Sequence, residues 1–212
     1  MLSDQMAVLR ETPSAQARRL YDELVKRLTD AATVEGALKE GDVFPEFALP
    51  DDDGSFVLSS DLLKSGPLVI NFYRGRWCQF CAATLQAMSA AAPAISAAGA
   101  TVIGISPEAG HLSFSTHREP RLNFKMLCDL DNGLALQCGL LFRLTEDVIR
   151  KYLGDSLDLT QVYGNGSWFL PIPATYIVLP HGEISRAYVN PDFRFRMEPQ
   201  DILRAVQSLK PR

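Results

Sequence analysis

Cysteine and histidine are both scarce in this chain, which has 4 Cys and 3 His among 212 residues. Protein zinc sites usually draw their ligands from closely spaced pairs of these two residue types. The three histidines show no such spacing, and Cys128 and Cys138 lie too far apart to form a second pair beside Cys78 and Cys81. We therefore expect no metal, and we interpret Cys128 and Cys138 as small apolar packing residues.

Strong charge of one sign and long apolar runs are also missing. The net charge is −4, and the 21 Lys and Arg residues are scattered, which disfavours nucleic acid or an anionic membrane as the main partner. No apolar segment approaches the roughly 18 residues that span a bilayer, and "MLSDQMAVLR" has no basic start leading into an apolar run. The expected location is the cytoplasm, where a cysteine pair is more often catalytic or metal-binding than a structural disulfide.

Short apolar runs alternate with helical stretches over most of the chain. We predict strands at 68–73, 101–106, 124–127, 174–179 and 184–189, the last two forming a hairpin. Helices are predicted at 78–98, 108–119, 131–138, 145–153 and 198–209, and Pro93 is expected to end or kink the first of these. This order predicts an α/β fold, with a central mixed sheet flanked by helices.

The N-terminal part has a different pattern. Residues 14–30 form a predicted amphipathic helix with Ser14 as its N-cap and Leu20, Leu24 and Leu28 along one face. We place a boundary near residue 40, which gives a helical extension at 1–40 and a main domain at 41–212. The leucine face must pack against the main domain or a second chain, and we favour a homodimer.

The stretch "LVINFYRGRWCQFC" places Cys78 and Cys81 where a buried strand gives way to a helix. Free N–H groups and the helix dipole stabilise an anion there, which lowers the pKa of a thiol. Arg74 and Arg76 add positive charge, although solvated arginines are the default interpretation of both. The spacing lets one sulfur attack and the other resolve the mixed disulfide, with Cys78 expected to be the more exposed of the two.

Two further segments are candidates for the same site. Pro173 stands just before a predicted strand, either as a cis residue facing the cysteines or as a rigid loop end. The glycine-containing loop at 162–168, "VYGNGSW", is either a mobile rim beside the cysteines or a plain connection.

Five segments in order resemble the peroxiredoxin-like proteins of the alkyl hydroperoxide reductase and thiol-specific antioxidant superfamily. They are "GDVFPEFALPDDDG", "NFYRGRWCQFC", "VIGISPE", "FKMLCDLDNG" and "LPIPATYIVLPHGEI". The resemblance covers roughly residues 41–209. It implies a thioredoxin fold and thiol chemistry on peroxides or disulfides without a cofactor.

The departures from that family concern the residues around the reactive sulfur. Laying its PxxxTxxC motif on this chain puts Cys81 at the peroxidatic position, Cys78 at the Thr and Arg74 at the Pro, while Pro173 replaces a distant Arg. Trp77 and Cys78 instead resemble the WCxxC of thioredoxin, and Pro173 its cis-Pro. The buried acid of thioredoxin is Asn71 here, and an amide cannot accept a proton from Cys81. Thioredoxin logic thus names Cys78 as the nucleophile, and peroxiredoxin logic names Cys81.

Three functions remain open at this point. The first is a thiol peroxidase that reduces hydroperoxides through a Cys78–Cys81 dithiol/disulfide cycle and is itself reduced by thioredoxin or glutaredoxin. The second is a disulfide oxidoreductase acting on protein or low-molecular-weight disulfides. The third is a redox sensor without turnover. We favour the first.

Overall fold

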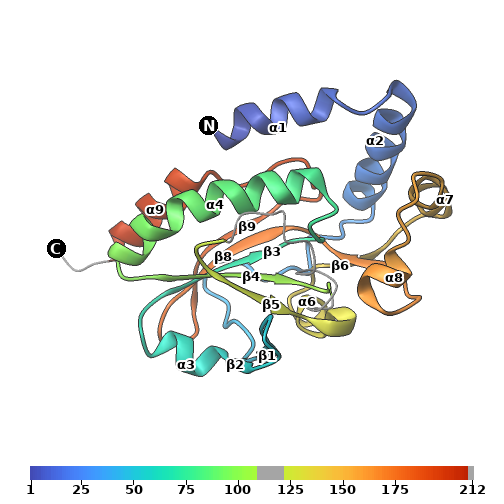
Figure 1. The fold of residues 1–212 in the computed structure, drawn as a ribbon. Coiled ribbons are helices and arrows are strands. Elements are labelled where there is room, and N and C mark those ends of the chain that lie inside the picture. Colours follow the sequence, from blue (N-terminus) through green and yellow to red (C-terminus); the bar gives the residue numbers. More distant parts are fainter. Residues whose placement is uncertain (109–121, 210–212) are drawn as a thin grey trace.

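The computed structural model describes residues 1–108 and 122–209, so the helix predicted at 108–119 lies outside the described residues apart from Glu108. A five-stranded sheet in the order β5-β4-β3-β8-β9 forms the centre (Figure 1). Strands β3 (Leu68–Phe72), β4 (Thr101–Ser106) and β5 (Lys125–Cys128) are parallel. Strands β8 (Ala174–Val178) and β9 (Ile184–Val189) form an antiparallel hairpin that joins the sheet through β8 and β3. The predicted mixed sheet is confirmed.

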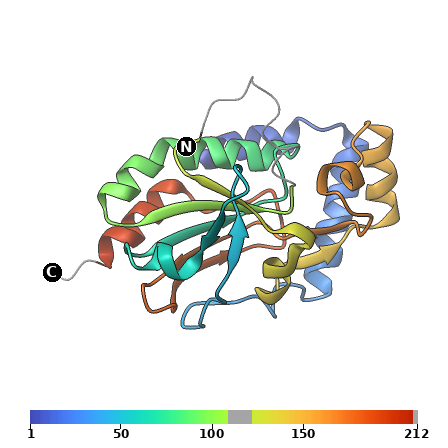
Figure 2. The same ribbon diagram turned by 60° about the horizontal axis from the view of Figure 1, so that its bottom comes forward.

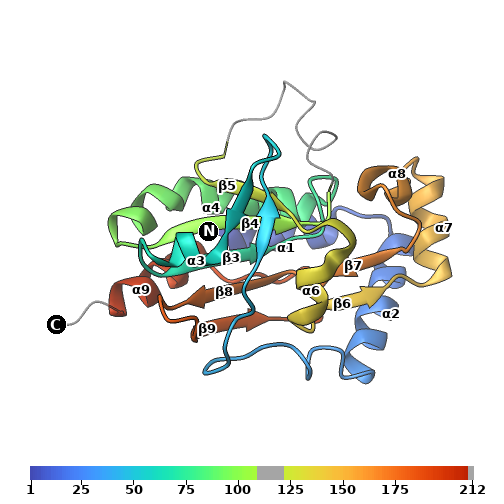
Figure 3. The same ribbon diagram turned by 90° about the horizontal axis from the view of Figure 1, so that it is seen from below.

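Helices cover both faces of this sheet. The long α4 (Gln79–Ala97) and the C-terminal α9 (Pro199–Ser208) lie on one face (Figure 1). The other face carries α3 (Ser59–Leu63), α6 (Gly133–Gln137) and the hairpin of β1 (Ala48–Pro50) and β2 (Phe56–Leu58), as Figure 3 shows from below. Every residue of β3 and β8 is buried, which explains why both strands are apolar apart from Asn71 and Thr175.

A smaller unit stands at the end of the sheet where the parallel strands finish. It consists of the antiparallel pair β6 (Leu141–Arg143) and β7 (Phe169–Pro171), with α7 (Glu146–Gly154) and α8 (Leu159–Tyr163) between them (Figures 1 and 2). A 3-10 turn at Leu130–Asn132 precedes α6. The helices predicted at 131–138, 145–153 and 198–209 are thereby confirmed.

Of the two alternatives expected for Pro93, an end or a kink of the helix, the first is wrong, because α4 continues through Pro93 to Ala97. A proline inside a helix leaves the carbonyl four residues earlier without its usual N–H donor. That carbonyl belongs to Ser89, and it accepts a hydrogen bond from the Asn123 side-chain amide at 3.0 Å, while the Ser89 hydroxyl accepts from the Asn123 backbone N–H at 2.8 Å. A side chain from a distant segment thus replaces the missing helical hydrogen bond.

Helix α4 is also long and apolar enough to cross a membrane by length and composition alone. The sequence-based statement that no apolar segment approaches that length is therefore too strong. In the structure, α4 lies on the sheet beside α9, and α1 packs on its outer side, which is the position of a core helix. Its buried face includes Leu85, Met88 and Ile95.

Two helices precede the sheet, α1 (Leu2–Glu11) and α2 (Ala15–Asp30). The predicted α2 is confirmed, including the Ser14 cap, whose hydroxyl accepts the Ala17 N–H at 3.2 Å; α1 was not predicted. Leu24 and Leu28 of α2 are buried in the same apolar cluster as strand β3. The chain itself therefore covers the leucine face, which no longer supports a homodimer; the dimer and the domain boundary stay predictions.

Candidate active site

The loop after β3 is shaped by a glycine that cannot be replaced without strain. Gly75 has a φ of +145°, and a Cβ built on it lies 2.3 Å from Trp77 Nε1 and 2.7 Å from the Glu108 carboxylate. This tight turn lets the backbone reverse between Arg74 and Cys78, the N-cap residue of α4. The first free N–H groups of the longest described helix follow Cys78 directly.

Arg74 lies against the sulfur of Cys78. One guanidinium nitrogen, Nη2, donates to Cys78 Sγ at 3.0 Å, and both residues are buried, with 2% and 3% of their surface exposed. The guanidinium stacks on Phe193, 3.8 Å from the ring centroid, and lies 5.3 Å from the Trp77 ring. The default interpretation of a solvated arginine is wrong for Arg74.

Arg76 plays a different part from Arg74. It is half-buried, and its backbone N–H donates to the Glu108 carboxylate at 3.0 Å, which fixes the loop on the end of β4. Of the two arginines predicted beside the cysteines, Arg74 donates to a sulfur and Arg76 fixes the loop through its backbone.

Two tyrosines from the smaller unit hold the same loop. Trp77 Nε1 donates to the Tyr163 hydroxyl at 3.2 Å, and that hydroxyl in turn donates to the Arg74 backbone carbonyl. The Trp77 ring also packs edge-on against Tyr152 of α7, with 5.4 Å between centroids. The segment that begins at Val162 therefore borders the site through Tyr163, which is buried.

The sulfur of Cys81 faces a second arginine. Arg196 lies in the connection between β9 and α9, and its Nη2 donates to Cys81 Sγ at 3.6 Å. Its Nη1 donates to the carbonyls of Phe193 and Phe195, the latter at 2.7 Å. Cys81 is fully buried, whereas Arg196 is half-buried. Each of the two sulfurs therefore has its own guanidinium.

This arrangement separates the acidities of the two thiols. Burial alone raises the pKa of Cys78, but the hydrogen bond from Cys81 and the charges of Arg74 and Arg196 hold that pKa well below its ordinary value. Burial, together with the hydrogen bond to Cys78 and the Cys78 charge, raises the pKa of Cys81 well above its ordinary value. The two pKa values therefore move apart, so Cys78 loses its proton before Cys81 does, and the Cys81 S–H donates to the Cys78 sulfur.

The N-terminal helices close the site from outside. Tyr21 of α2 packs edge-on against Phe193, with centroids 5.6 Å apart, and Phe193 is the ring that carries Arg74. Figure 1 shows α2 standing beside α7 at the end of the sheet where α4 begins. Cys78 was expected to be the more exposed cysteine, but the exposed fractions are 3% for Cys78 and 0% for Cys81, so both thiols are buried.

Pro173 lies just before β8 and Asn71 lies within the central strand β3, as expected from the sequence. Among the described contacts, neither residue is joined to a sulfur. The peptide bond before Pro173 is trans, so the cis alternative is wrong. Phe72, the last residue of β3, pairs with Ala174, the first residue of β8. The buried Pro173 therefore begins β8 at the same end of the sheet as the cysteine loop. Asn71 accepts from the Thr175 hydroxyl at 3.3 Å on the neighbouring strand.

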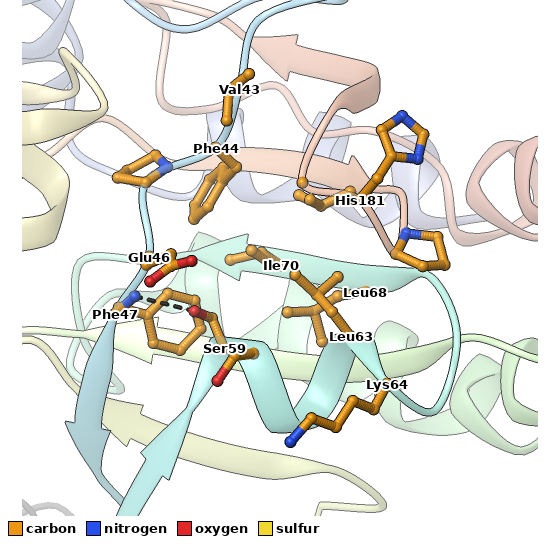
Figure 4. Close-up of a pocket in the computed structure, with 15 residues that line it drawn as sticks. Val43, Phe44, Glu46, Phe47, Ser59, Leu63, Lys64, Leu68, Ile70 and His181 are labelled. Carbon is orange, nitrogen blue, oxygen red and sulfur yellow. Dashed lines mark hydrogen bonds between the residues drawn. The ribbon is translucent and has the colours of Figure 1, made fainter.

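The remaining features of the chain stand apart from this pair. Cys138 is fully buried in the apolar core, and burial with the nearby Asp129 charge raises its pKa to about 12, in keeping with a packing role. A cavity of about 400 Å³ opens at the opposite end of β3, between Phe44, Phe47 and Ile70 (Figure 4). The described residues that line it include no cysteine, so this cavity does not serve the thiols.

Sequence reasoning missed four residues of the site. Arg196, Phe193, Tyr152 and Tyr163 all come from segments far from the cysteines in the chain. The alternation of aromatic and basic residues in "FRFRM" (193–197) marks one of these segments, because such a pattern is unusual for an exposed connection. Tyr163 lies within the 162–168 loop that the sequence analysis considers as a rim of the site, and Tyr152 carries no comparable mark.

Fold and site together define a protein of the thioredoxin-like class with two neighbouring thiols at a helix N-terminus, each facing a guanidinium. Residues 41–187 match the model of the AhpC/TSA family, and the chain belongs to this family. The chain is 32% identical to peroxiredoxin Q of Triticum aestivum over 117 residues, 54% of this chain and 52% of that protein. It is 29% identical to peroxiredoxin Bcp of Escherichia coli over 103 residues, 49% of this chain and 65% of that protein.

Those matched regions are about half to two thirds of the relatives' lengths. Among solved structures, the chain resembles peroxidoxin BcpB from Mycobacterium tuberculosis, with a TM-score of 0.62 and 19% identity. That similarity covers 82% of this chain and 99% of the other, and it shows the shared fold.

Proposed function

We propose that this protein is a thiol peroxidase that reduces hydroperoxides through Cys78 and Cys81. The observation that carries the proposal is the contact between the buried Arg74 guanidinium and the Cys78 sulfur, which helps to lower the pKa of Cys78 while that of the neighbouring Cys81 is raised. Membership of the AhpC/TSA family and similarity to two peroxiredoxins support peroxide as the oxidant.

In the first step, the Cys78 thiolate attacks one oxygen of the hydroperoxide and breaks the O–O bond. The sulfur gains that oxygen as a sulfenic acid, and the other oxygen leaves as an alkoxide or hydroxide that takes up a proton. The positive charge of Arg74 stabilises the attacking thiolate and the negative charge that spreads to the oxygens in the transition state. The lowered pKa of Cys78 raises the fraction of thiolate at neutral pH.

In the second step, Cys81 resolves the sulfenic acid. Its sulfur loses a proton, attacks the Cys78 sulfur and displaces hydroxide, which leaves as water, so that a Cys78–Cys81 disulfide forms. A dithiol reductant of the thioredoxin or glutaredoxin kind then returns both sulfurs to thiols by exchange. One peroxide is reduced for each dithiol oxidised.

Disulfide exchange is the second candidate, because Cys78 at the first position of WCxxC is the activated sulfur, as in thioredoxin. Burial argues against large partners: with 3% of Cys78 exposed, a folded protein cannot reach the sulfur without displacing its cover. A hydroperoxide needs a far smaller opening. We therefore rank peroxide above protein disulfides as the oxidising substrate.

The deciding experiment compares wild type, Cys78→Ser, Cys81→Ser and, as a matched control, Cys138→Ala. Rapid mixing with hydrogen peroxide at neutral pH should show a step at least about a hundredfold faster than that of free cysteine in wild type, Cys81→Ser and the control. Cys78→Ser should lose this step. A fast step that survives in Cys78→Ser and is lost in Cys81→Ser names Cys81 as the attacking sulfur, and no fast step in any form removes the peroxidase.

A further inference from the structure

Arg196 reaches the site from a part of the chain that the cysteine motif does not contain. It is separated from Cys81 by 115 residues in sequence, yet its Nη2 lies 3.6 Å from Cys81 Sγ. The family pattern expects an arginine before β8, and Pro173 stands there instead. A guanidinium thus approaches the second sulfur from a different element.

The connection that carries Arg196 is itself fixed. Nη1 of Arg196 bonds to the Phe193 and Phe195 carbonyls, which leaves Nη2 directed at Cys81. The neighbouring Arg194 pairs with Asp192 at 2.8 Å and with Asp22 of α2 at 2.6 Å. Among the described residues, no carboxylate is paired with the guanidinium of Arg196, so its charge is available to the sulfur.

We propose that Arg196 is the positioning residue for Cys81: it stabilises the Cys81 thiolate whenever the catalytic cycle requires one. This inference rests on the proposed function and assigns the two arginines different steps. Arg74 serves the attack of Cys78 on the peroxide, and Arg196 serves the resolution by Cys81.

The cycle requires a Cys81 thiolate twice. To close the disulfide, Cys81 must lose its proton before its electron pair attacks the Cys78 sulfenic sulfur and hydroxide leaves. When a dithiol reductant attacks the disulfide at Cys78, the Cys81 sulfur departs with the bonding electron pair. A buried sulfur is a poor anion unless a positive charge faces it, and the charge of Arg196 opposes the rise in the pKa of Cys81 that burial causes.

The plain alternative is that Arg196 only fastens its own connection through the two carbonyls. The two roles differ in what a lysine does. A lysine ammonium keeps a point charge near Cys81 but cannot reproduce the guanidinium contacts to both carbonyls and the sulfur. An electrostatic role therefore predicts partial rescue by lysine, and a fastening role predicts none.

The experiment uses the full chain with Arg196→Gln, Arg196→Lys and the control Arg204→Gln, which removes an exposed arginine paired with Asp201 on α9. Reduced protein is mixed with hydrogen peroxide and quenched with dimedone, and mass spectrometry counts sulfenic acid and disulfide over time. We expect Arg196→Gln to slow disulfide closure at least about tenfold, and to slow it more than the peroxide step, so that labelled Cys78 accumulates. Arg196→Lys should recover part of the closure rate, and Arg204→Gln should match wild type.

Two results overturn the inference while leaving the peroxidase in place. Closure at the wild-type rate in Arg196→Gln shows that the arginine does not serve Cys81. A loss confined to the peroxide step shows that Arg196 serves the attack, which makes Cys81 the attacking sulfur.

A second measurement does not depend on peroxide. In a Cys78→Ser background, the pH profile of Cys81 alkylation by iodoacetamide should move to higher pH when Arg196 becomes Gln, and less so when it becomes Lys. An unmoved profile overturns the inference even if the protein proves not to be a peroxidase.

Discussion

At the scale of single residues, the chemistry of the site depends on why Arg74 is buried. A buried charge is costly unless it is paired, and the partner here is the Cys78 sulfur rather than a carboxylate. The stack on Phe193 adds cation–π attraction that a lysine could not reproduce in the same plane. Because the guanidinium needs an anion, it stabilises Cys78 in the thiolate form, and substitution should remove that preference.

Replacing Arg74 by Gln tests this directly. We expect the rate of Cys78 alkylation in the Cys81→Ser background to fall by about a hundredfold at pH 6. The reason is that the pKa of Cys78 rises toward its ordinary value, so less thiolate remains at that pH. The check is the pH profile of iodoacetamide labelling, with the exposed Arg186→Gln as control; overlapping profiles for Arg74→Gln and the control contradict the pairing.

Gly75 makes a second prediction at this scale. Gly75→Ala should destabilise the fold by about 1–3 kcal/mol, because the methyl group meets Trp77 and Glu108 and the backbone holds a positive φ. Gly54→Ala is the matched control, since Gly54 also has a positive φ (+79°) but nothing lies within 4 Å of the added carbon. Thermal unfolding should show a clearly larger loss for Gly75→Ala, and equal losses would remove the steric argument.

At the scale of elements, the continuity of α4 depends on one side chain outside it. Asn123→Ala removes the donor to the Ser89 carbonyl and should cost about 1–2 kcal/mol of unfolding free energy. In a Pro93→Ala background the helix supplies its own N–H to that carbonyl, so the same Asn123→Ala substitution should cost less. Denaturant unfolding of wild type, the two single variants and the double variant gives the coupling free energy between Asn123 and Pro93. Strictly additive losses of stability would contradict the coupling.

The elements that the sequence predicts are those whose pattern is local. Strands β3, β4 and β8 are buried apolar runs, and α2 has both a cap and a periodic leucine face, so each was found within a residue or two. Helix α1 has only Leu2 and Met6 buried, and Met1 is a poor cap, so no local pattern marks it as a helix. The path of α4 through Pro93 depends on Asn123, which no local pattern connects with it.

The residues of the site also fall into those that a local sequence pattern predicts and those that depend on distant segments. The motif places Cys78 and Cys81 at the end of a strand and the start of a helix because one short segment contains the whole arrangement. The choice between the two sulfurs depends on Arg74 burial and on Arg196, and both follow from packing between distant segments. That is why the thioredoxin and peroxiredoxin alignments left the nucleophile open, and why the solvated interpretation of Arg74 failed.

At the scale of the whole molecule, Glu198 joins the two ends of the described chain. Its carboxylate accepts the N–H groups of Leu2 at 3.1 Å and Ser3 at the start of α1, although Glu198 itself precedes α9. Burial alone would raise the pKa of Glu198, but these N–H groups hold it below its ordinary value. A carboxyl whose folded pKa is lowered contributes its full stability above about pH 4.5 and loses it as the pH falls through the lowered value.

We therefore expect α1 to loosen at acid pH before the sheet does. Hydrogen exchange of the peptide 1–11, corrected for the intrinsic pH dependence, should accelerate about two- to fivefold relative to β3 as the pH falls from 5 to 3, in line with the modest energy of a charge at a helix start. Glu198→Gln should show the faster exchange already at pH 7 and little further change. If wild type and Glu198→Gln exchange alike at both pH values, the carboxylate does not anchor α1.

We expect the N-terminal helices to restrict which substrates can reach the sulfurs. They lie across the site through Tyr21 on Phe193, Arg10 over the Phe195 ring at 4.6 Å, and the ion pair of Asp22 with Arg194. Because Phe193 carries the guanidinium of Arg74, we expect a protein-sized disulfide to reach Cys78 only after α2 moves, whereas hydrogen peroxide requires only a small opening.

We expect the intact chain to react rapidly with hydrogen peroxide and to reduce insulin slowly. The double variant Arg10→Ala/Asp22→Ala weakens the contacts of α1 and α2 with the site without changing a residue that contacts either sulfur. Insulin turnover should then rise at least about fivefold, as expected for the loss of surface contacts of about 1 kcal/mol. The rate of the peroxide step should stay within about twofold of wild type. Arg18→Ala, which breaks an exposed pair with Glu11 within the same helices, is the control. Equal insulin turnover in all three proteins would mean that α1 and α2 do not restrict access to Cys78.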